Sequence, residues 1–439
     1  MTITLVETQN RPKSADLYKR LCEVIPSGVG SPTRAFKYVT EEPMVVSRGH
    51  ADMIYDVDGN AFIDYHMSWG ALINGHAHPT IVEALQKRIV DGTSYGLCCA
   101  LEEELARKIT QNVPSVEQVR FVASGTEATM TALRVARGYT GRDYVVKFTG
   151  NYHGHADFLL VRGGSAMVGN TPCASSAGVP ADSVKWTLCL PYNDIETARE
   201  VLRSPEYRDK IAAVIVEPIA GNMGTVPGSK EFLTMLREET EKNGSLLIFD
   251  EVISGFRVGL GGAQALYGIS PDLTCFAKVM SGGTQAAAFG GAKKIMQVLA
   301  PSGAVYQAGT FSGNPLSMEA GIQTLNLLEQ PGVFELLEQK AANLLDPIQE
   351  CFKAKNAPAC VQRVGSMFTF FFGATSISSM EEAQKCDDAL FKKFFSFLFE
   401  HGILVAPAHY EASFISTVHS DEHLNYTRDV ILEFIEHTF

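Results

Sequence analysis

The sequence predicts an α/β fold with a mostly parallel sheet, together with a smaller α+β region. Two observations support this prediction. Between about residue 76 and residue 328, short apolar segments alternate with segments of helical periodicity, a pattern typical of a parallel sheet with helices on both faces. Before Gly75 and after about residue 330 the pattern changes. The length of 439 residues, about three times the commonest domain size, also favours more than one domain.

The N-terminal region is expected to contain a helix and a small antiparallel piece. Residues 14–25 show helical periodicity and precede the loop Pro26–Gly30. Ile54–Val57 and Ala61–Tyr65 are separated by Asp58-Gly59, a dipeptide that favours a tight hairpin turn.

The central region begins with a helix at Pro79, because proline is favoured in the first helical turn and apolar residues then recur at helical spacing up to Gly92. We expect strands at Val119–Ala123, Tyr144–Phe148, Ala212–Glu217, Leu246–Asp250 and Leu273–Ala277. We expect helices at Glu127–Gly138, Ser229–Asn243 and Asn314–Glu329. After residue 330 we expect a helix over 333–355, strands around 362–372, a helix over 380–401 and a strand at 403–405.

Composition excludes several classes of partner. The formal net charge is −12 with no basic block, which argues against general nucleic-acid binding and against an anionic membrane surface. The longest apolar runs, such as Ile211–Val216, are far shorter than the ~20 residues of a membrane-spanning helix. The N-terminus carries no basic stretch leading into a long apolar run, so a secretory signal is not expected.

Cysteine and histidine patterns predict reduced thiols and no metal site. The nine cysteines are scattered and form no CxxC pair, which favours a cytoplasmic protein without disulfides or zinc. His76 and His78, and likewise His153 and His155, have ligand-like spacing, but no third ligand is suggested. We therefore interpret these histidines as local structure.

The segment Ser124-Gly125-Thr126 follows an apolar strand and opens a predicted helix. Free N–H groups at a helix start, with a glycine and two hydroxyls, suit a phosphate. An ordinary helix cap at Ser124 is the structural alternative.

Two further strand ends carry ionisable residues. Asp250 ends one predicted strand and Lys278 follows another, and the carboxyl ends of parallel strands line the crevice where open sheets bind ligands. Asp250 could instead cap a helix or bind a metal, and Lys278 could be a surface charge. Together with the phosphate site, however, an aspartate and a lysine supply what pyridoxal phosphate needs: an anchor, a partner for the ring nitrogen and an amine for the aldehyde.

Gly163–Pro180 is long, small and polar, so it is either a surface loop or a mobile lid over an active site.

These motifs, in this order, resemble the fold-type I pyridoxal-phosphate enzymes of the class III aminotransferase family, and more closely the glutamate-1-semialdehyde aminomutases within it. The resemblance runs from Pro26 to about Thr427. Its motifs are Gly30–Phe36 (GSPTRAF), Ser68–Gly70 (SWG), Gly75–Pro79 (GHAHP), Ser124–Ala128 (SGTEA), Tyr152–Asp157 (YHGHAD), Val216–Pro218 (VEP), Gly221–Gly224 (GNMG), Phe249–Arg257 (FDEVISGFR), Ala277-Lys278, Gly309–Pro315 (GTFSGNP) and Glu411.

The resemblance implies a large cofactor-binding domain over 76–328 with a seven-stranded type of sheet. It also implies a small domain built from 1–75 and 329–439. It favours the lid interpretation of 163–180.

The resemblance also implies roles for individual residues. Lys278 would hold the cofactor and shuttle protons, Asp250 would bind the ring nitrogen and Tyr152 would stack on the ring. Ser124, Gly125 and Thr126 would hold the phosphate, Asn222 would lie near the ring hydroxyl, and Thr310 would reach in from the second subunit of a homodimer. The substrate would be bound by Arg34 at its carboxylate, by Glu411 near its amine, and by Ser31, Trp69 and Ser165.

The implied reaction is an intramolecular amino transfer that converts (S)-4-amino-5-oxopentanoate into 5-aminolevulinate, a tetrapyrrole precursor. The cofactor would alternate between its pyridoxal and pyridoxamine forms. Three departures from the family pattern concern Ala71, Asn74 and the stretch 279–289, which lacks a usual proline. Two alternatives stay open: an ω-aminotransferase with an external amino donor and, because of the altered stretch after Lys278, a catalytically impaired cofactor-binding homologue.

Overall fold

The computed structural model describes residues 10–162 and 173–439. It contains two compact units. Unit 1 combines the described part of Met1–Pro79 with Gly332–Ile377 and Glu382–Phe439, and unit 2 comprises the described part of Thr80–Pro331 with Ser378–Glu381. Unit 1 is thus assembled from both ends of the chain, whereas unit 2 is nearly continuous in sequence.

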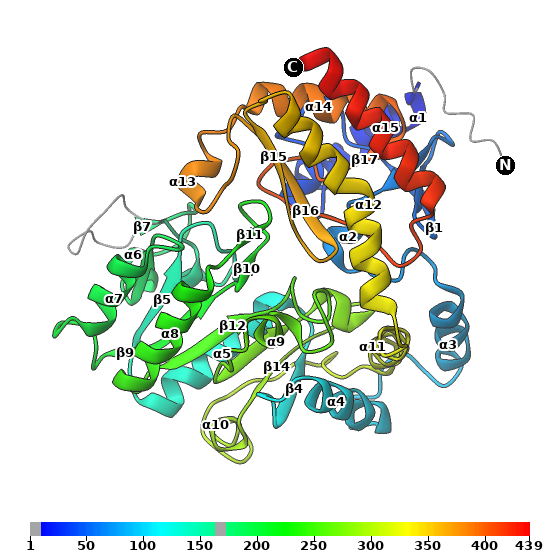
Figure 1. Cartoon of the computed structure of the whole chain (residues 1–439). Helices are drawn as coiled ribbons and strands as arrows, with labels where there is room; N and C mark the ends of the chain where they lie inside the picture. The colour runs from blue at the N-terminus through cyan, green and yellow to red at the C-terminus, as the bar shows by residue number, and fades with distance from the viewer. Residues whose placement is uncertain (1–9, 163–172) are drawn as a thin grey trace. The chain divides into compact units, whose positions relative to one another are not determined.

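Unit 2 is built on a seven-stranded sheet (Figure 1). In spatial order its strands are β4 (Gln118–Val122), β14 (Ala287–Gly291), β13 (Leu273–Phe276), β12 (Leu246–Asp250), β9 (Ile211–Val216), β5 (Tyr144–Phe148) and β8 (Thr187–Leu190). The pairs from β13 through β12, β9 and β5 to β8 are parallel, while β14 is antiparallel to both of its neighbours. The predicted α/β fold with a mostly parallel sheet is therefore confirmed.

Helices cover both faces of this sheet. Val145 of β5 belongs to the apolar cluster that includes α5 (Gly125–Thr140). Phe148, three residues along the same strand, packs against Phe232 of α8 (Lys230–Asn243), with ring centroids 5.0 Å apart. Because side chains alternate along a strand, the two contacts lie on opposite faces. This explains why a strand such as β9 is apolar at every position.

The other helices of unit 2 are shorter or lie along its edges. They are α3 (Pro79–Ile89), α4 (Ala100–Asn112), α6 (Ala181–Val184), α7 (Ile195–Arg203), α9 (Gly262–Tyr267), α10 (Lys293–Met296) and α11 (Pro315–Leu328). Two small antiparallel pairs also occur: β6 (Val161–Arg162) with β7 (Cys173–Ala174), and β10 (Ile219–Ala220) with β11 (Val226–Pro227).

Unit 1 contains two small sheets. One has the order β1 (Val46–His50), β2 (Met53–Asp56), β3 (Ala61–Asp64) and β17 (Ile403–Leu404), and the other β15 (Ala359–Val364), β16 (Met367–Phe372) and β18 (Ser413–Phe414). The predicted hairpin is confirmed as β2 and β3. The parallel pairing of Ile63 with Ile403 joins the N-terminal and C-terminal segments in one sheet.

The helices of unit 1 close its core. They are α1 (Pro12–Val24), the short left-handed turn α2 (Met67–Gly70), α12 (Val333–Ala354), α14 (Asp388–Glu400) and α15 (Asp421–Thr438). Phe62 and Leu344 share a buried cluster with Phe394 and Ile431. Residues more than 300 positions apart in the sequence thus form a single apolar core.

One predicted helix and two missed strands need correction. The helix expected over 380–401 is divided into α13 (Met380–Ala383) and α14. Asp387 interrupts the helix between α13 and α14. Its N–H donates to Phe372 O at 2.7 Å, and its carboxylate accepts the Leu390 N–H and so caps the start of α14. The sequence patterns did not predict strands β8 and β14, which are short and, in β14, composed largely of alanine and glycine.

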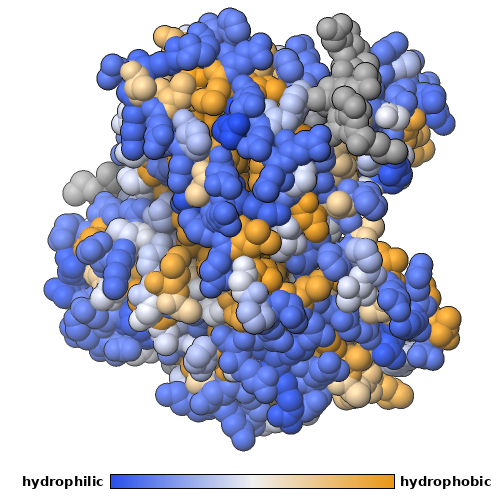
Figure 2. Space-filling view, turned by 45° about the vertical axis from the view of Figure 1, so that its right-hand side comes forward, coloured by the Kyte–Doolittle hydropathy of each residue, from blue (hydrophilic) through white to orange (hydrophobic). Residues whose placement is uncertain are grey.

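Figure 2 shows one face of the molecule, on which hydrophilic residues predominate and hydrophobic residues form separate patches. In the ranges 10–162 and 173–439, no helix is long and apolar enough to cross a membrane.

Candidate active site

The first turn of α5 forms one wall of the site. Ser124 is the N-cap, and its hydroxyl accepts the Glu127 N–H at 3.2 Å, while the Glu127 carboxylate accepts the Ala123 N–H at 2.9 Å. The structural alternative for the Ser124 hydroxyl, a helix cap, is therefore what the structure contains. The N–H groups of Gly125 and Thr126 lie in the first turn, where a helix offers no internal acceptor and its dipole favours an anion.

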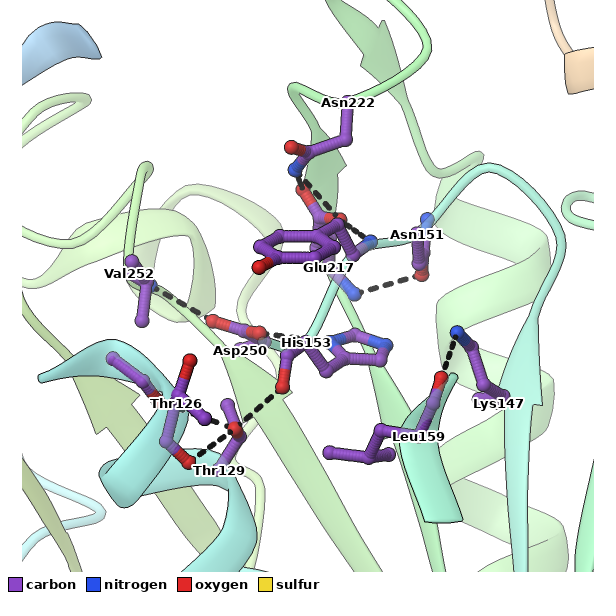
Figure 3. Close-up of polar contacts among 12 residues, drawn as sticks. Thr126, Thr129, Lys147, Asn151, His153, Leu159, Glu217, Asn222, Asp250 and Val252 are labelled. Atoms are coloured by element: carbon purple, nitrogen blue, oxygen red, sulfur yellow. Dashed lines mark hydrogen bonds and ion pairs between the residues drawn. The ribbon is translucent and has the colours of Figure 1, made fainter. Parts of the chain in front are cut away.

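A glycine brings a second segment against this turn. Gly154 has φ +81°, and a Cβ on it would lie 2.5 Å from the Thr126 hydroxyl oxygen. The Thr129 hydroxyl donates to His153 O at 2.6 Å. Tyr152–Gly154 is thereby held directly beside the start of α5 (Figure 3).

Asp250, at the carboxyl end of β12, is buried and paired with a histidine. One carboxylate oxygen lies 2.7 Å from His153 Nδ1, and the other accepts the Val252 N–H at 3.1 Å (Figure 3). Burial lowers the pKa of His153 although its hydrogen bond with Asp250 opposes this shift. A neutral imidazole that donates its Nδ1–H leaves Asp250 as an anionic acceptor, able to pair with a cationic nitrogen.

Lys278 follows β13 with φ +44°, a left-handed conformation that is uncommon outside glycine. Such strain persists only where surrounding structure holds it, and it is frequent at functional sites.

These elements enclose a cavity of about 240 Å³. Seven predicted site residues line it: Ser124, Gly125, Thr126, Tyr152, Asn222, Asp250 and Lys278. Tyr152 keeps 49% of its surface exposed at this wall, which leaves its ring available for stacking. The cavity thus combines an anion site, a carboxylate, an aromatic face and an amine, which fits a phosphorylated aromatic aldehyde with a basic ring nitrogen.

Three polar residues around this cavity were not given roles from the sequence. His153 pairs with Asp250, and the buried Glu217 holds Asn222 and Tyr152. Lys147 is buried in the sheet and donates to Leu159 O at 3.1 Å, and burial lowers its pKa. The available signal was a charged residue inside the otherwise apolar strand β5 and another directly after the apolar strand β9, because a buried charge needs a partner.

Thr310 does not line this cavity. It lies at a second hollow of about 380 Å³ in unit 2, together with Leu97 and Asn314. Ser165 lies outside the described residues, as do residues 163–172 of the predicted lid.

The remaining predicted substrate residues belong to unit 1. Ser31 and Arg34 lie at the short helix Pro32–Ala35, where Arg34 is exposed. Trp69 is half-buried with φ +56°, and its ring centroid lies 4.0 Å from that of His66. The backbone oxygen of Glu411 accepts the Thr369 hydroxyl at 3.1 Å. Non-glycine residues with positive φ, such as Trp69, are often functional.

The histidine pairs do not form a metal centre in the described part of the chain, where no group of three or more potential ligands occurs. His76 instead lies 2.7 Å from a carboxylate oxygen of the buried Asp64.

Comparison with known proteins gives consistent matches. The family model for aminotransferase class-III matches residues 36–434. The glutamate-1-semialdehyde 2,1-aminomutase of Protochlamydia amoebophila is 54% identical over 98% of this chain and 100% of its own length, and an enzyme of the same name from Brevibacillus brevis is 48% identical with the same coverage. Among solved structures, an omega-transaminase from Sphaerobacter thermophilus superposes with a TM-score of 0.89 at 32% identity, covering 96% of this chain and 97% of its own. A glutamate-1-semialdehyde-aminomutase from Pseudomonas aeruginosa, with a TM-score of 0.87 at 23% identity and coverage of 97% and 94%, shares the fold.

Proposed function

This chain belongs to the class-III aminotransferase family, and from that premise we propose that it is a pyridoxal-phosphate-dependent glutamate-1-semialdehyde 2,1-aminomutase. Its reaction would be the intramolecular amino transfer from (S)-4-amino-5-oxopentanoate to 5-aminolevulinate. One observation carries the proposal: a helix start, a buried carboxylate and a lysine line one cavity, in a chain that aligns with aminomutases over nearly its whole length.

The residues of the cavity suit each part of the cofactor. The first turn of α5, at Gly125 and Thr126, would hold the phosphate, and Asp250 would pair with the ring nitrogen. Tyr152 would stack on the ring, and Asn222 would meet its hydroxyl. When bound, pyridoxal phosphate draws electrons from the substrate carbon that bears nitrogen, which makes the proton on that carbon acidic.

Lys278 would hold the cofactor aldehyde and move the proton at its Nζ. An amine can remove and return a proton only while it is positioned within hydrogen-bond reach of the reacting carbon. The backbone strain at Lys278 is consistent with a side chain whose direction matters more than its local stability. Asp250 would keep the ring nitrogen protonated, because its own hydrogen bonds from His153 and Val252 leave it an acceptor.

Substrate binding would fall to unit 1. Arg34 would pair with the substrate carboxylate through two parallel N–H donors, and Glu411 would face the amine. Ser31 and Trp69 of unit 1 would line the remainder, together with Ser165 from the segment 80–331 of the chain. Placing the substrate residues on a different unit from Lys278 would let substrate binding and cofactor chemistry be altered separately.

We also propose a homodimer in the cytoplasm. Thr310 lies at a hollow separate from the cofactor cavity, so it could serve a phosphate only across an interface. Leu97 and Phe311 near that hollow are 82% and 61% exposed, apolar surface that a second copy of the chain would cover. All nine cysteines are free thiols, as expected in a reducing compartment.

The test is product formation without an amino donor. The purified protein, converted to its pyridoxamine form, should make 5-aminolevulinate from (S)-4-amino-5-oxopentanoate through many turnovers. A need for a second amino acid would instead identify an aminotransferase with an external donor. A protein that binds the cofactor but transfers no amino group to any acceptor would be an impaired homologue.

A further inference from the structure

Glu217 is a buried carboxylate at the wall of the cofactor cavity, where it is hydrogen-bonded to two other lining residues, Tyr152 and Asn222. It follows β9, and only 3% of its surface is exposed. Its backbone is anchored on both sides, because its N–H donates to the Asn151 side-chain oxygen at 3.0 Å and its carbonyl accepts the Tyr192 hydroxyl at 2.9 Å. The carboxylate is therefore held in one place.

Both oxygens of this carboxylate accept backbone and side-chain donors. Oε1 accepts the Tyr152 N–H at 2.6 Å, and Oε2 accepts the Gly221 N–H at 3.0 Å. The Asn222 Nδ2 donates to both oxygens at 3.1 Å. Glu217 is thus hydrogen-bonded both to Tyr152, which would stack on the cofactor ring, and to Asn222, which would meet the ring hydroxyl.

This arrangement decides which end of the Asn222 amide faces away from Glu217. An ionised carboxylate offers no hydrogen, so the amide must present its nitrogen to Glu217 and turn its oxygen the other way. Figure 3 shows the Asn222 nitrogen at the two dashed contacts and the oxygen on the opposite side of the amide. Asn222 lines the cavity, and because Glu217 takes its nitrogen, the amide oxygen is the polar atom that the side chain can turn toward a ligand there.

The charge of Glu217 depends on its surroundings. Burial, and then the negative charge of Asp250, raise the pKa of Glu217, while the hydrogen bonds from Gly221, Tyr152 and Asn222 oppose this shift. The other titratable groups that interact with it are Lys147 and Tyr192. A cation paired with Asp250 would reduce the repulsion, so a bound cofactor favours the ionised form.

We propose that Glu217 is a positioning residue that holds the Asn222 amide with its oxygen toward the cofactor, so that the ring hydroxyl meets an acceptor and not a donor. This inference rests on the proposed function, since it needs the cofactor in this cavity. It assigns no contact between Glu217 and substrate or cofactor.

The test is a pH titration of the visible absorption band of the holoenzyme, without substrate. In Glu217→Gln the new amide group donates to Asn222, so the Asn222 amide turns and presents its NH₂ group to the ring oxygen. A donor stabilises the deprotonated ring oxygen, and the midpoint of the titration should fall by about one pH unit, the size expected for one hydrogen bond. Glu231→Gln, an exposed site on α8, makes the same charge change away from the cavity and should leave the midpoint unchanged.

A second background separates positioning from a simple loss of charge. In Asn222→Ala, the further change Glu217→Gln should leave the midpoint unmoved, because no amide remains to turn. If the full shift persists in that background, Glu217 acts through its charge alone and the inference is wrong. If Glu217→Gln does not fold, Asn222→Ala alone must still lower the midpoint, and an unchanged midpoint overturns the inference.

Failure of the proposed function would look different. A wild-type protein that develops no visible band with pyridoxal phosphate contradicts that function. A different result would contradict only the role of Glu217. In that case the protein shows the band and forms 5-aminolevulinate, but Glu217→Gln shifts the titration midpoint equally with and without the Asn222 side chain.

Discussion

The two units of this protein differ in how the chain builds them. Unit 2 is nearly continuous from Thr80 to Pro331, and all seven predicted site residues that line the cofactor cavity belong to it. Unit 1 draws on both ends of the chain, and the predicted substrate residues with described positions, from Ser31 to Glu411, all belong to it. This division suggests that cofactor chemistry depends on the sheet of unit 2, while substrate choice depends on a unit that can vary independently.

The largest expected effect concerns the chemistry assigned to unit 2. Lys278→Ala should lower the rate of 5-aminolevulinate formation by at least about 10³-fold, because it removes the group proposed both to attach the cofactor and to carry the proton. The rate is measured with added pyridoxamine phosphate, and Lys87→Ala, an exposed lysine on α3, is the matched control. Wild-type activity in Lys278→Ala would contradict the assignment.

A smaller and different effect is expected in unit 1. Arg34→Ala should raise KM by about 10- to 100-fold, since one hydrogen-bonded charge on the substrate carboxylate is lost. The affinity for pyridoxal phosphate should stay unchanged, because Arg34 belongs to the other unit. Arg20→Ala, an exposed arginine of α1, is the control. Loss of cofactor affinity in Arg34→Ala would remove the proposed division of labour.

Mixing two inactive variants tests whether the cofactor site of one subunit uses its own Thr310 or the Thr310 of a second subunit. In a heterodimer of Lys278→Ala and Thr310→Ala chains, one site retains its lysine and receives an intact threonine from the other subunit. If the proposed two-fold symmetric dimer forms, activity should therefore recover to at most about half of the wild-type value. If each subunit used its own Thr310, mixing would restore nothing.

The smallest expected effect is on the stability of unit 1. His423 Nδ1 lies 2.7 Å from Asp52, so a residue from the C-terminal segment pairs with one from the N-terminal segment. The hydrogen bond that His423 donates to Asp52 raises the pKa of His423, although burial opposes it. Burial would raise the pKa of Asp52, but its hydrogen bonds and the nearby histidines outweigh this and lower it.

The sign of the pH dependence follows from these two shifts. The contribution of His423 is fully present below its unfolded pKa of about 6.5 and is lost as pH rises through its raised folded pKa. That of Asp52 is present above about pH 4 and is lost in acid. His423→Gln should therefore cost about 1 kcal/mol near pH 5.5 and less near pH 9, measured by chemical denaturation. His437→Gln, near the exposed end of α15, is the control; equal losses at both pH values would exclude the ion pair.

Local sequence patterns were sufficient for five of the seven strands in the main sheet of unit 2. The predicted strands Tyr144–Phe148 and Leu246–Asp250 agree with β5 and β12 residue for residue, because strands buried on both faces form nearly continuous apolar runs. Antiparallel β14 was missed, since its small residues, Ala287–Gly291, carry no strand signal of their own. Strand β14 is recognised only in the tertiary structure, where it pairs with β4 on one side and β13 on the other.

The sequence by itself determined the residue types that the chemistry needs and their places at strand ends and helix starts, because period, caps and turns are local properties. Only the tertiary structure decided which other side chains are hydrogen-bonded to these residues. Asp250 meets His153 across 97 residues, and Tyr152 meets Glu217 across 65. Such pairs depend on which strands lie side by side in the sheet, and no spacing along the chain specifies that order. The apolar runs were enough to predict the sheet. The partners of the few charged groups buried in it became known only from the side chains that lie next to them in the structure.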